Sequence, residues 1–221
     1  MTTLIAHRGY SGKYGDNNMM SFQAAYDNGF NMIETDVQLC KTGEIVIYHD
    51  LQCNDKLVSD MSLDEVYKNG IITLDDFFNK IDPQKIAIFL DIKGDLDLSE
   101  QLYNLLVNRF LLDALQHIYI SGFNRIIMEN ITQYVGTTFP IKLGFTTANS
   151  YTPQQCEFLF ERVDFVCLCL SILNKSFIEK IKSMGKHVFT YTCNTKRDLT
   201  YASMFDVDGI VTNFHPDDFI H

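Results

Sequence analysis

The feature that most constrains the fold is a regular exchange between short strand-like runs and longer segments of helical periodicity. Runs rich in β-branched and aromatic side chains predict strands, and apolar positions three or four residues apart predict helices. The expected strands cover residues 4–9, 32–39, 86–93, 117–123, 141–147, 165–170, 187–193 and 209–213. The expected helices cover residues 19–28, 98–110, 125–134, 153–162, 175–184 and 196–204.

Eight such units in series predict an α/β fold of the (β/α)8 TIM-barrel type. The alternative is a doubly wound open sheet, which usually has about five or six strands. Between the second and third barrel strands there is room for an extra strand at 44–49 and short helices at 62–68 and 74–80. The last helix, "PDDFIH", is short, and no linker or repeat divides the chain, so we expect one domain over residues 1–221.

Charge and composition narrow the choice of partners. The formal net charge of −10 repels nucleic acid and anionic membranes, so a phosphate-bearing small molecule would need local cations or a metal. Apolar runs are too short to span a bilayer and no signal peptide is evident, so we expect a soluble, cytoplasmic protein without stable membrane insertion. The six cysteines lack Cys-X-X-Cys spacing, which favours reduced thiols in the core.

Polar side chains gather where the first strands end, which is where the active site of a parallel barrel lies. The motifs are "AHRG", "NMIETDVQL", a histidine-aspartate pair and "LDIKGD". These side chains are His7 and Arg8 after the first strand, Glu34 and Asp36 within the second, His49 and Asp50 after the extra strand, and Asp91 and Lys93 at the end of the third. Taken singly, each has a structural explanation, and their convergence is what favours a site.

Three of these residues suggest a metal site. Glu34 and Asp36 alternate onto one face of their strand, and Asp91 follows the next barrel strand. Three carboxylates in an apolar barrel mouth repel one another unless a proton or a cation neutralises them. Oxygen ligands without cysteine favour one divalent cation, Mg²⁺ or Ca²⁺, over zinc.

The remaining residues suit phosphodiester chemistry. Arg8 and Lys93 can hold a phosphate by charge-assisted hydrogen bonds. His7 and His49 can supply the base and the acid that cleavage of a P–O bond requires, because imidazole titrates near neutral pH. Asn213 follows the last strand and can line the mouth or cap a turn, and the same alternatives hold for Asp208.

These motifs resemble the glycerophosphodiester phosphodiesterase family. The resemblance rests on "HRG" at 7–9, "IETDV" at 33–37, "HD" at 49–50 and "LDIK" at 90–93, with softer matches in "YISGF", "VFTYTCN" and "DVDGIVTNFHPD". It implies a TIM barrel and metal-dependent hydrolysis of glycerophosphodiesters to glycerol 3-phosphate and an alcohol. It also implies residue roles: His7 and His49 as the acid/base pair, Glu34, Asp36 and Asp91 as metal ligands, and Arg8, Lys93, Asn17, Phe123 and Tyr191 in substrate binding.

The chain departs from the family pattern in four places. "GDNN" at 15–18 replaces "PENT", Asp91 stands where glutamate is more common, and Tyr191 replaces a tryptophan. The connection after "HD" is shorter than the small insertion of common members. Two alternatives therefore remain: an enzyme like lysophospholipase D or sphingomyelinase D that acts through a cyclic phosphate, or a non-catalytic barrel that binds phosphodiesters.

Overall fold

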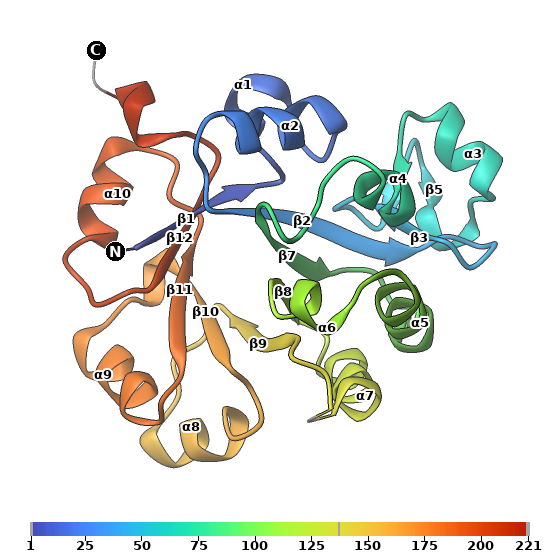
Figure 1. Cartoon of the computed structure of the whole chain (residues 1–221). Helices are drawn as coiled ribbons and strands as arrows, with labels where there is room; N and C mark the ends of the chain where they lie inside the picture. The colour runs from blue at the N-terminus through green and yellow to red at the C-terminus, as the bar shows by residue number, and fades with distance from the viewer. Residues whose placement is uncertain (1, 137, 220–221) are drawn as a thin grey trace.

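A closed ring of eight parallel strands forms the centre of the molecule, as expected (Figure 1). The computed structural model describes residues 2–136 and 138–219. In order around the ring, the strands are β1 (Thr3–His7), β2 (Met32–Leu39), β7 (Ala87–Ile92), β8 (Ile118–Gly122), β9 (Lys142–Thr147), β10 (Phe165–Cys169), β11 (His187–Tyr191) and β12 (Gly209–Thr212). Parallel pairing of β1 with both β12 and β2 closes the ring, which rules out the open sheet.

Helices surround the strands, and all six expected helices are present. They are α2 (Met19–Asp27), α5 (Ser99–Arg109), α7 (Arg125–Val135), α8 (Pro153–Leu159), α9 (Lys175–Ser183) and α10 (Lys196–Ala202). Two four-residue helices, α1 (Ser11–Tyr14) and α6 (Leu112–Leu115), were not expected. Side-chain caps fix several helix starts: for example, the Thr152 hydroxyl accepts a hydrogen bond from the backbone N–H of Gln155 at the start of α8.

The segment between β2 and β7 builds a small layer at the side of the barrel (Figure 1). Strand β3 (Ile45–Ile47) pairs antiparallel with β2, and β6 (Ile72–Thr73) pairs with β3. The rest comprises the hairpin β4 (Gln52–Cys53) and β5 (Lys56–Leu57), the 3-10 turn η1 (Val58–Asp60), and the helices α3 (Leu63–Lys68) and α4 (Leu74–Phe78). The segment between β2 and β7 thus contains the expected strand and both expected helices.

The barrel interior is closed by aromatic packing. The ring of Phe165 lies 5.4 Å from that of Phe89 and 5.0 Å from that of Phe189, measured between centroids. These three side chains come from three strands and are at most 4% exposed. Together with smaller apolar residues they fill the centre of the barrel, which leaves polar side chains to collect above them at the C-terminal ends of the strands.

A short turn after β12 contacts the segment that follows β1. The 3-10 turn η3 (Pro216–Phe219) follows β12, and positions 220–221 of the expected last helix lie outside the described residues. The carboxylate of Asp218 accepts a hydrogen bond from the Tyr10 hydroxyl at 2.6 Å and forms an ion pair with Lys13. This contact ties the end of the chain to α1, directly after β1.

The cysteines and the helices bear on two expectations from composition. All six cysteines are free thiols, and five of them are buried. Across residues 2–136 and 138–219, no helix has both the length and the apolar character needed to cross a bilayer.

Candidate active site

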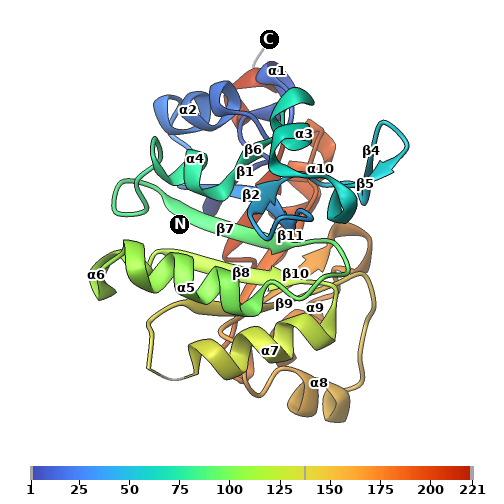
Figure 2. The same ribbon diagram turned by 90° about the vertical axis from the view of Figure 1, so that its right-hand side faces the viewer.

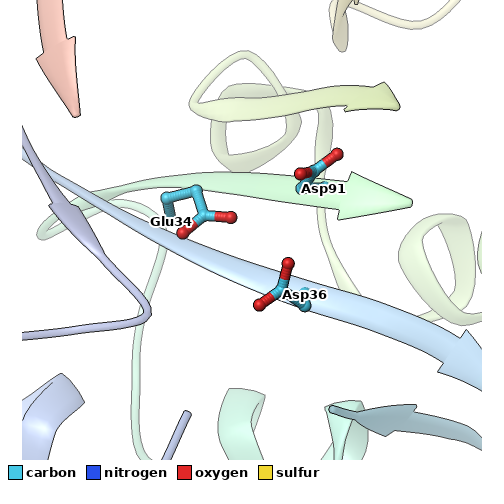
Figure 3. A group of neighbouring side chains, drawn as sticks. All are labelled: Glu34, Asp36 and Asp91. Atoms are coloured by element: carbon cyan, nitrogen blue, oxygen red, sulfur yellow. The ribbon is translucent and has the colours of Figure 1, made fainter. Parts of the chain in front are cut away.

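Three carboxylates from two neighbouring strands meet at the mouth of the barrel (Figure 3). Glu34 and Asp36 lie on β2, and Asp91 of β7 is the register partner of Asp36. One oxygen from each carboxylate lies within 4.8 Å of those of the other two. The strand alternation predicted for Glu34 and Asp36 therefore brings both side chains to the same point, together with Asp91.

The electrostatics of this group favour a bound cation. Glu34 is 3% exposed and Asp36 is 1% exposed. Burial, followed by the neighbouring carboxylates, raises the pKa of Glu34 well above its usual value. Burial likewise raises the pKa of Asp91 to about 6, although Lys93 opposes the shift. Because Asp91 Oδ1 is buried and has no hydrogen-bond partner among the described residues, the three carboxylates fit a hard divalent ion that takes oxygen ligands.

Arg8 lies directly beside the carboxylates. Its backbone is in the left-handed region, with φ of 57°, and this turn aims its N–H at Glu34 Oε2 at 2.9 Å. The guanidinium donates to Asp16 Oδ2 at 2.7 Å. Nε lies 3.1 Å from Asp36 Oδ2, but this ion pair lacks hydrogen-bond geometry, so within the part of the chain that the structure describes the Nε–H has no acceptor. An anion in the site can therefore accept from this group.

Lys93 places a second cation on the other side of the site. Its Nζ lies 2.6 Å from Asp91 Oδ2 and 3.4 Å from Asp36 Oδ1. Burial lowers the pKa of Lys93, but Asp91 and Asp36 outweigh it and raise the pKa overall. The ammonium group stays charged and also lies 5.5 Å from the centre of the Phe123 ring.

Asn17 orients one of the three carboxylates by a hydrogen bond. Its backbone is left-handed, with φ of 53°, and its amide donates to Asp36 Oδ2 at 2.9 Å. Its Oδ1 accepts a hydrogen bond from Thr35 Oγ1 at 2.9 Å. The residue that the "GDNN" segment shares with the family pattern therefore orients a carboxylate, and it is not among the residues that line the cavity.

The two histidines have different environments. His7 Nδ1 lies 2.6 Å from Asn213 Oδ1, and burial together with Arg8 lowers the pKa of His7. Because an amide oxygen only accepts, the proton sits on His7 Nδ1 and Nε2 keeps its lone pair. His49 is 41% exposed in its side chain, and its Nδ1 lies 2.7 Å from Asp50 Oδ1. One imidazole is therefore partly buried beside a neutral partner, and the other is exposed beside a carboxylate.

One cavity of about 180 Å³ gathers nearly all of the predicted residues. Its lining includes His7, Arg8, Glu34, Asp36, His49, Asp91, Lys93, Phe123 and Tyr191. The rings of Phe123 and Tyr191 meet edge to face, 6.1 Å apart, and form an aromatic wall. A larger cavity of about 390 Å³ lies between α7 and α8 and contains none of these residues.

The sequence left the roles of two residues near the last barrel strand open. Asn213 is one, since capping and lining roles were both open, and it contacts His7. The other, Asp208, lies at the opposite end of β12, where it binds Lys182 and the backbone N–H of Val188, each at 2.7 Å. Cys167, expected to be core, is buried and also lines the cavity. The feature of the sequence that pointed to Asn213 as a site residue is its position directly after the last barrel strand.

Comparisons with known proteins agree with this geometry. The model of the glycerophosphoryl diester phosphodiesterase family matches residues 7–217. The chain is 25% identical to a glycerophosphodiester phosphodiesterase from Caldanaerobacter subterraneus subsp. tengcongensis, over 96% of this chain and 94% of that protein. It is 42% identical to the uncharacterized protein YqiK of Bacillus subtilis, over 97% of this chain and 96% of YqiK.

Solved structures share the fold. A phosphodiesterase from Oleispira antarctica, determined in complex with the product sn-glycerol-3-phosphate, superimposes with a TM-score of 0.79 at 21% identity. The match covers 97% of this chain and 94% of that one. At this level of identity the likeness shows a shared barrel architecture.

Proposed function

Because the chain belongs to the glycerophosphoryl diester phosphodiesterase family, and so to the phosphoric diester hydrolases, we propose that it hydrolyses glycerophosphodiesters to glycerol 3-phosphate and an alcohol. The observation that carries the proposal is the convergence of three carboxylates, two cationic side chains and two histidines on one cavity. In this proposal residues 1–221 act as one catalytic domain that takes a small-molecule phosphodiester.

The proposal includes one divalent cation, Mg²⁺ or Ca²⁺, held by Glu34, Asp36 and Asp91. Such an ion, when bound, supplies charge stabilisation at the phosphoryl oxygens. The support is the donor set itself: three carboxylates whose oxygens lie within 4.8 Å of one another, and a buried Asp91 oxygen to which none of the described residues donates a hydrogen bond. In this role Asn17 keeps the carboxylate of Asp36 in place through its 2.9 Å hydrogen bond.

Arg8 and Lys93 would bind the phosphate from two sides. The Nε–H of Arg8 has no hydrogen-bond acceptor in residues 2–136 and 138–219, and Lys93 Nζ can donate further hydrogen bonds beyond its contact with Asp91. Both cations border the same cavity as the carboxylates. Phe123 and Tyr191 would form the adjoining wall against the organic part of the substrate.

The environments of the histidines assign their roles in this proposal. His7 is the general base, because burial and Arg8 lower its pKa and Asn213 holds the proton on Nδ1. Its Nε2 then accepts the proton of the attacking hydroxyl. His49 is the general acid, because it lines the cavity and Asp50 Oδ1, 2.7 Å from its Nδ1, holds the ring in place for proton donation to the leaving alkoxide.

The test is to follow glycerophosphocholine hydrolysis by the purified chain with ³¹P NMR, with Mg²⁺, with Ca²⁺ and with EDTA. We expect a glycerol 3-phosphate signal with a cation and none with EDTA. A transient five-membered cyclic phosphate signal would identify the substrate's own hydroxyl as the nucleophile, as in the enzymes related to lysophospholipase D. Binding of glycerophosphocholine without turnover under any of these conditions would support a binding barrel and contradict the proposal.

A further inference from the structure

Exposed apolar side chains lie along three neighbouring loops on one side of the barrel mouth. Leu51 is 56% exposed, Leu96 40%, Phe123 48% and Ile126 76%. We call these four residues the apolar arc. Exposed leucine, isoleucine and phenylalanine side chains that gather beside a cavity indicate a binding surface, whereas scattered ones do not.

Contacts between the loops place the apolar arc in one region. The side-chain amide of Gln38 donates to the backbone oxygens of Tyr48 and Asp50 at 2.8 and 2.9 Å, which holds the loop of Leu51 against β2. A Cβ on Gly94 would lie 3.1 Å from Gln38, so the loop of Leu96 packs on the same side chain.

The other end of the apolar arc is joined to the same region through the next strand. Residue 92 at the end of β7 pairs with residue 122 at the end of β8, so the loops that follow the two strands are adjacent. Asn130 of α7 also donates to Asp97 at 2.6 Å. In Figure 2 the end of β7 and the β4–β5 hairpin lie at the right-hand side, whereas α6 lies at the left.

The apolar arc continues the catalytic cavity outward. Phe123 belongs to both, since it lines the cavity and is half exposed. Pockets that enclose a whole drug-sized ligand usually measure about 300–1,000 Å³. At about 180 Å³, this cavity accommodates a phosphate and a small group such as glycerol, and a larger substituent must lie outside it.

The opposite side of the mouth has a different character. The loop after β9 begins with the exposed residues 148–150, "ANS", and the loop after β11 exposes residues 195–197, "TKR". A substituent that leaves the cavity therefore meets polar side chains on one side and the apolar arc on the other. The apolar arc also adjoins His49, the proposed general acid, because Leu51 follows it by two residues.

We propose that the apolar arc binds the leaving alcohol of the substrate, and that this alcohol carries a long alkyl or acyl chain, as a monoacylglycerol does. This inference rests on the proposed function and specifies the alcohol that the proposed reaction releases. Water forms the new bond to phosphorus and gives its proton to the base, and the bond between phosphorus and the alcohol oxygen breaks. The alkoxide leaves with the bonding pair and takes a proton from the acid, so the products are glycerol 3-phosphate and the long-chain alcohol.

The test uses sn-glycero-3-phospho esters of ethanol, butanol, octanol and dodecanol, each kept below its micelle concentration. We measure kcat/KM for glycerol 3-phosphate release. The expected result is a rise of about two- to fourfold per methylene, the upper value being that of a fully buried methylene. A flat series with steady release from the ethanol ester overturns the inference and leaves the proposed function intact. No release from any ester contradicts the proposed function, and the inference falls with it.

Two serine variants locate the binding surface. Leu96→Ser and Ile126→Ser should retain the rate on the ethanol ester and reduce the rate on the dodecanol ester at least fivefold. Leu111→Ser is the matched control, because Leu111 is 79% exposed and directly precedes α6 at the far end of the barrel. All three side chains are exposed, and a thermal melt checks that each variant is folded. An equal loss in Leu111→Ser, or no loss in the other two, contradicts the assignment of the surface.

Discussion

Asn213 Oδ1 lies 2.6 Å from Nδ1 of His7, although 206 residues separate the two in the chain. The contact exists because β12 pairs with β1 and both strands end at the same face. Asn213 is itself held, since its backbone N–H donates to Asn194 Oδ1 at 3.1 Å. A neutral amide thus sets the tautomer of a partly buried imidazole without adding a negative charge beside it.

Replacement of Asn213 should therefore change the pH profile as well as the rate. In Asn213→Ala we expect kcat to fall by about tenfold or more with little change in KM, since the ring of His7 loses its anchor. In Asn213→Asp a carboxylate stabilises the imidazolium, so the acid limb of kcat/KM should move to higher pH. In the wild type this limb should lie below the ordinary histidine pKa of about 6.5. Identical limbs in wild type and Asn213→Asp would contradict the positioning role.

Loss of the proposed acid should be severe and specific. We expect His49→Ala to lower kcat on glycerophosphocholine by about 10²-fold or more. His187→Ala is the matched control, because His187 is an exposed histidine at the start of β11, away from the mouth. Near wild-type turnover in His49→Ala, measured by glycerol 3-phosphate release, would show that another group protonates the alcohol.

The buried carboxylates should make the metal-free protein less stable as pH rises. The folded pKa of Asp91, about 6, and that of Glu34 lie above their ordinary values near 4, so the folded state binds more protons than the unfolded state. Their favourable contribution to the free energy of unfolding is complete below about pH 4 and is lost as pH rises through the folded pKa values. For Asp91 alone this loss amounts to about 2–3 kcal/mol.

Thermal melts in EDTA from pH 4 to pH 8 measure this effect. The melting temperature should fall across the range, and saturating Mg²⁺ or Ca²⁺ should reverse the fall at neutral pH. Asp91→Asn should flatten the EDTA curve, and Asp95→Asn, a nearby exposed aspartate, should not. A melting temperature that is independent of both pH and cation would contradict this account of the carboxylate group.

The contact between η3 and the segment after β1 predicts a stability effect. Tyr10 is 2% exposed, and its hydroxyl donates to Asp218. Tyr10→Phe should reduce the free energy of unfolding by about 1.5–3 kcal/mol, because it leaves a charged acceptor with one donor fewer. Tyr14→Phe, at an exposed tyrosine of α1 close by, is the control. Urea unfolding measures both, and equal values for the two variants would contradict the role of this contact.

The barrel could be predicted from the sequence because its strands and long helices carry their own periodic patterns. Each expected strand agrees with the structure to within two residues, and β2 agrees at both ends. The shortest elements, among them α1, β4 and β5, were missed for a physical reason. Helix α1 has four residues and β4 and β5 have two each, so tertiary contacts rather than local pattern determine them.

The site residues that could be predicted from the sequence are those at strand ends or within recognisable motifs. Alternation along β2 was enough to pair Glu34 with Asp36, and the parallel barrel adds Asp91. What the sequence could not supply is the contact between distant strand ends, such as Asn213 with His7. Nor could it show that a left-handed backbone turns Asn17 onto Asp36, because that depends on the conformation of a single loop residue.

The most direct test of the central claim is glycerol 3-phosphate release from glycerophosphocholine as a function of free cation, starting from EDTA-treated protein. We predict no release without cation and a saturable rise with Mg²⁺ or Ca²⁺. In Asp91→Asn the half-saturating concentration should be at least tenfold higher, and in Asp95→Asn it should be unchanged. Full turnover in EDTA, or the same cation dependence in Asp91→Asn as in the wild type, would show that the three carboxylates do not hold a cation required for catalysis.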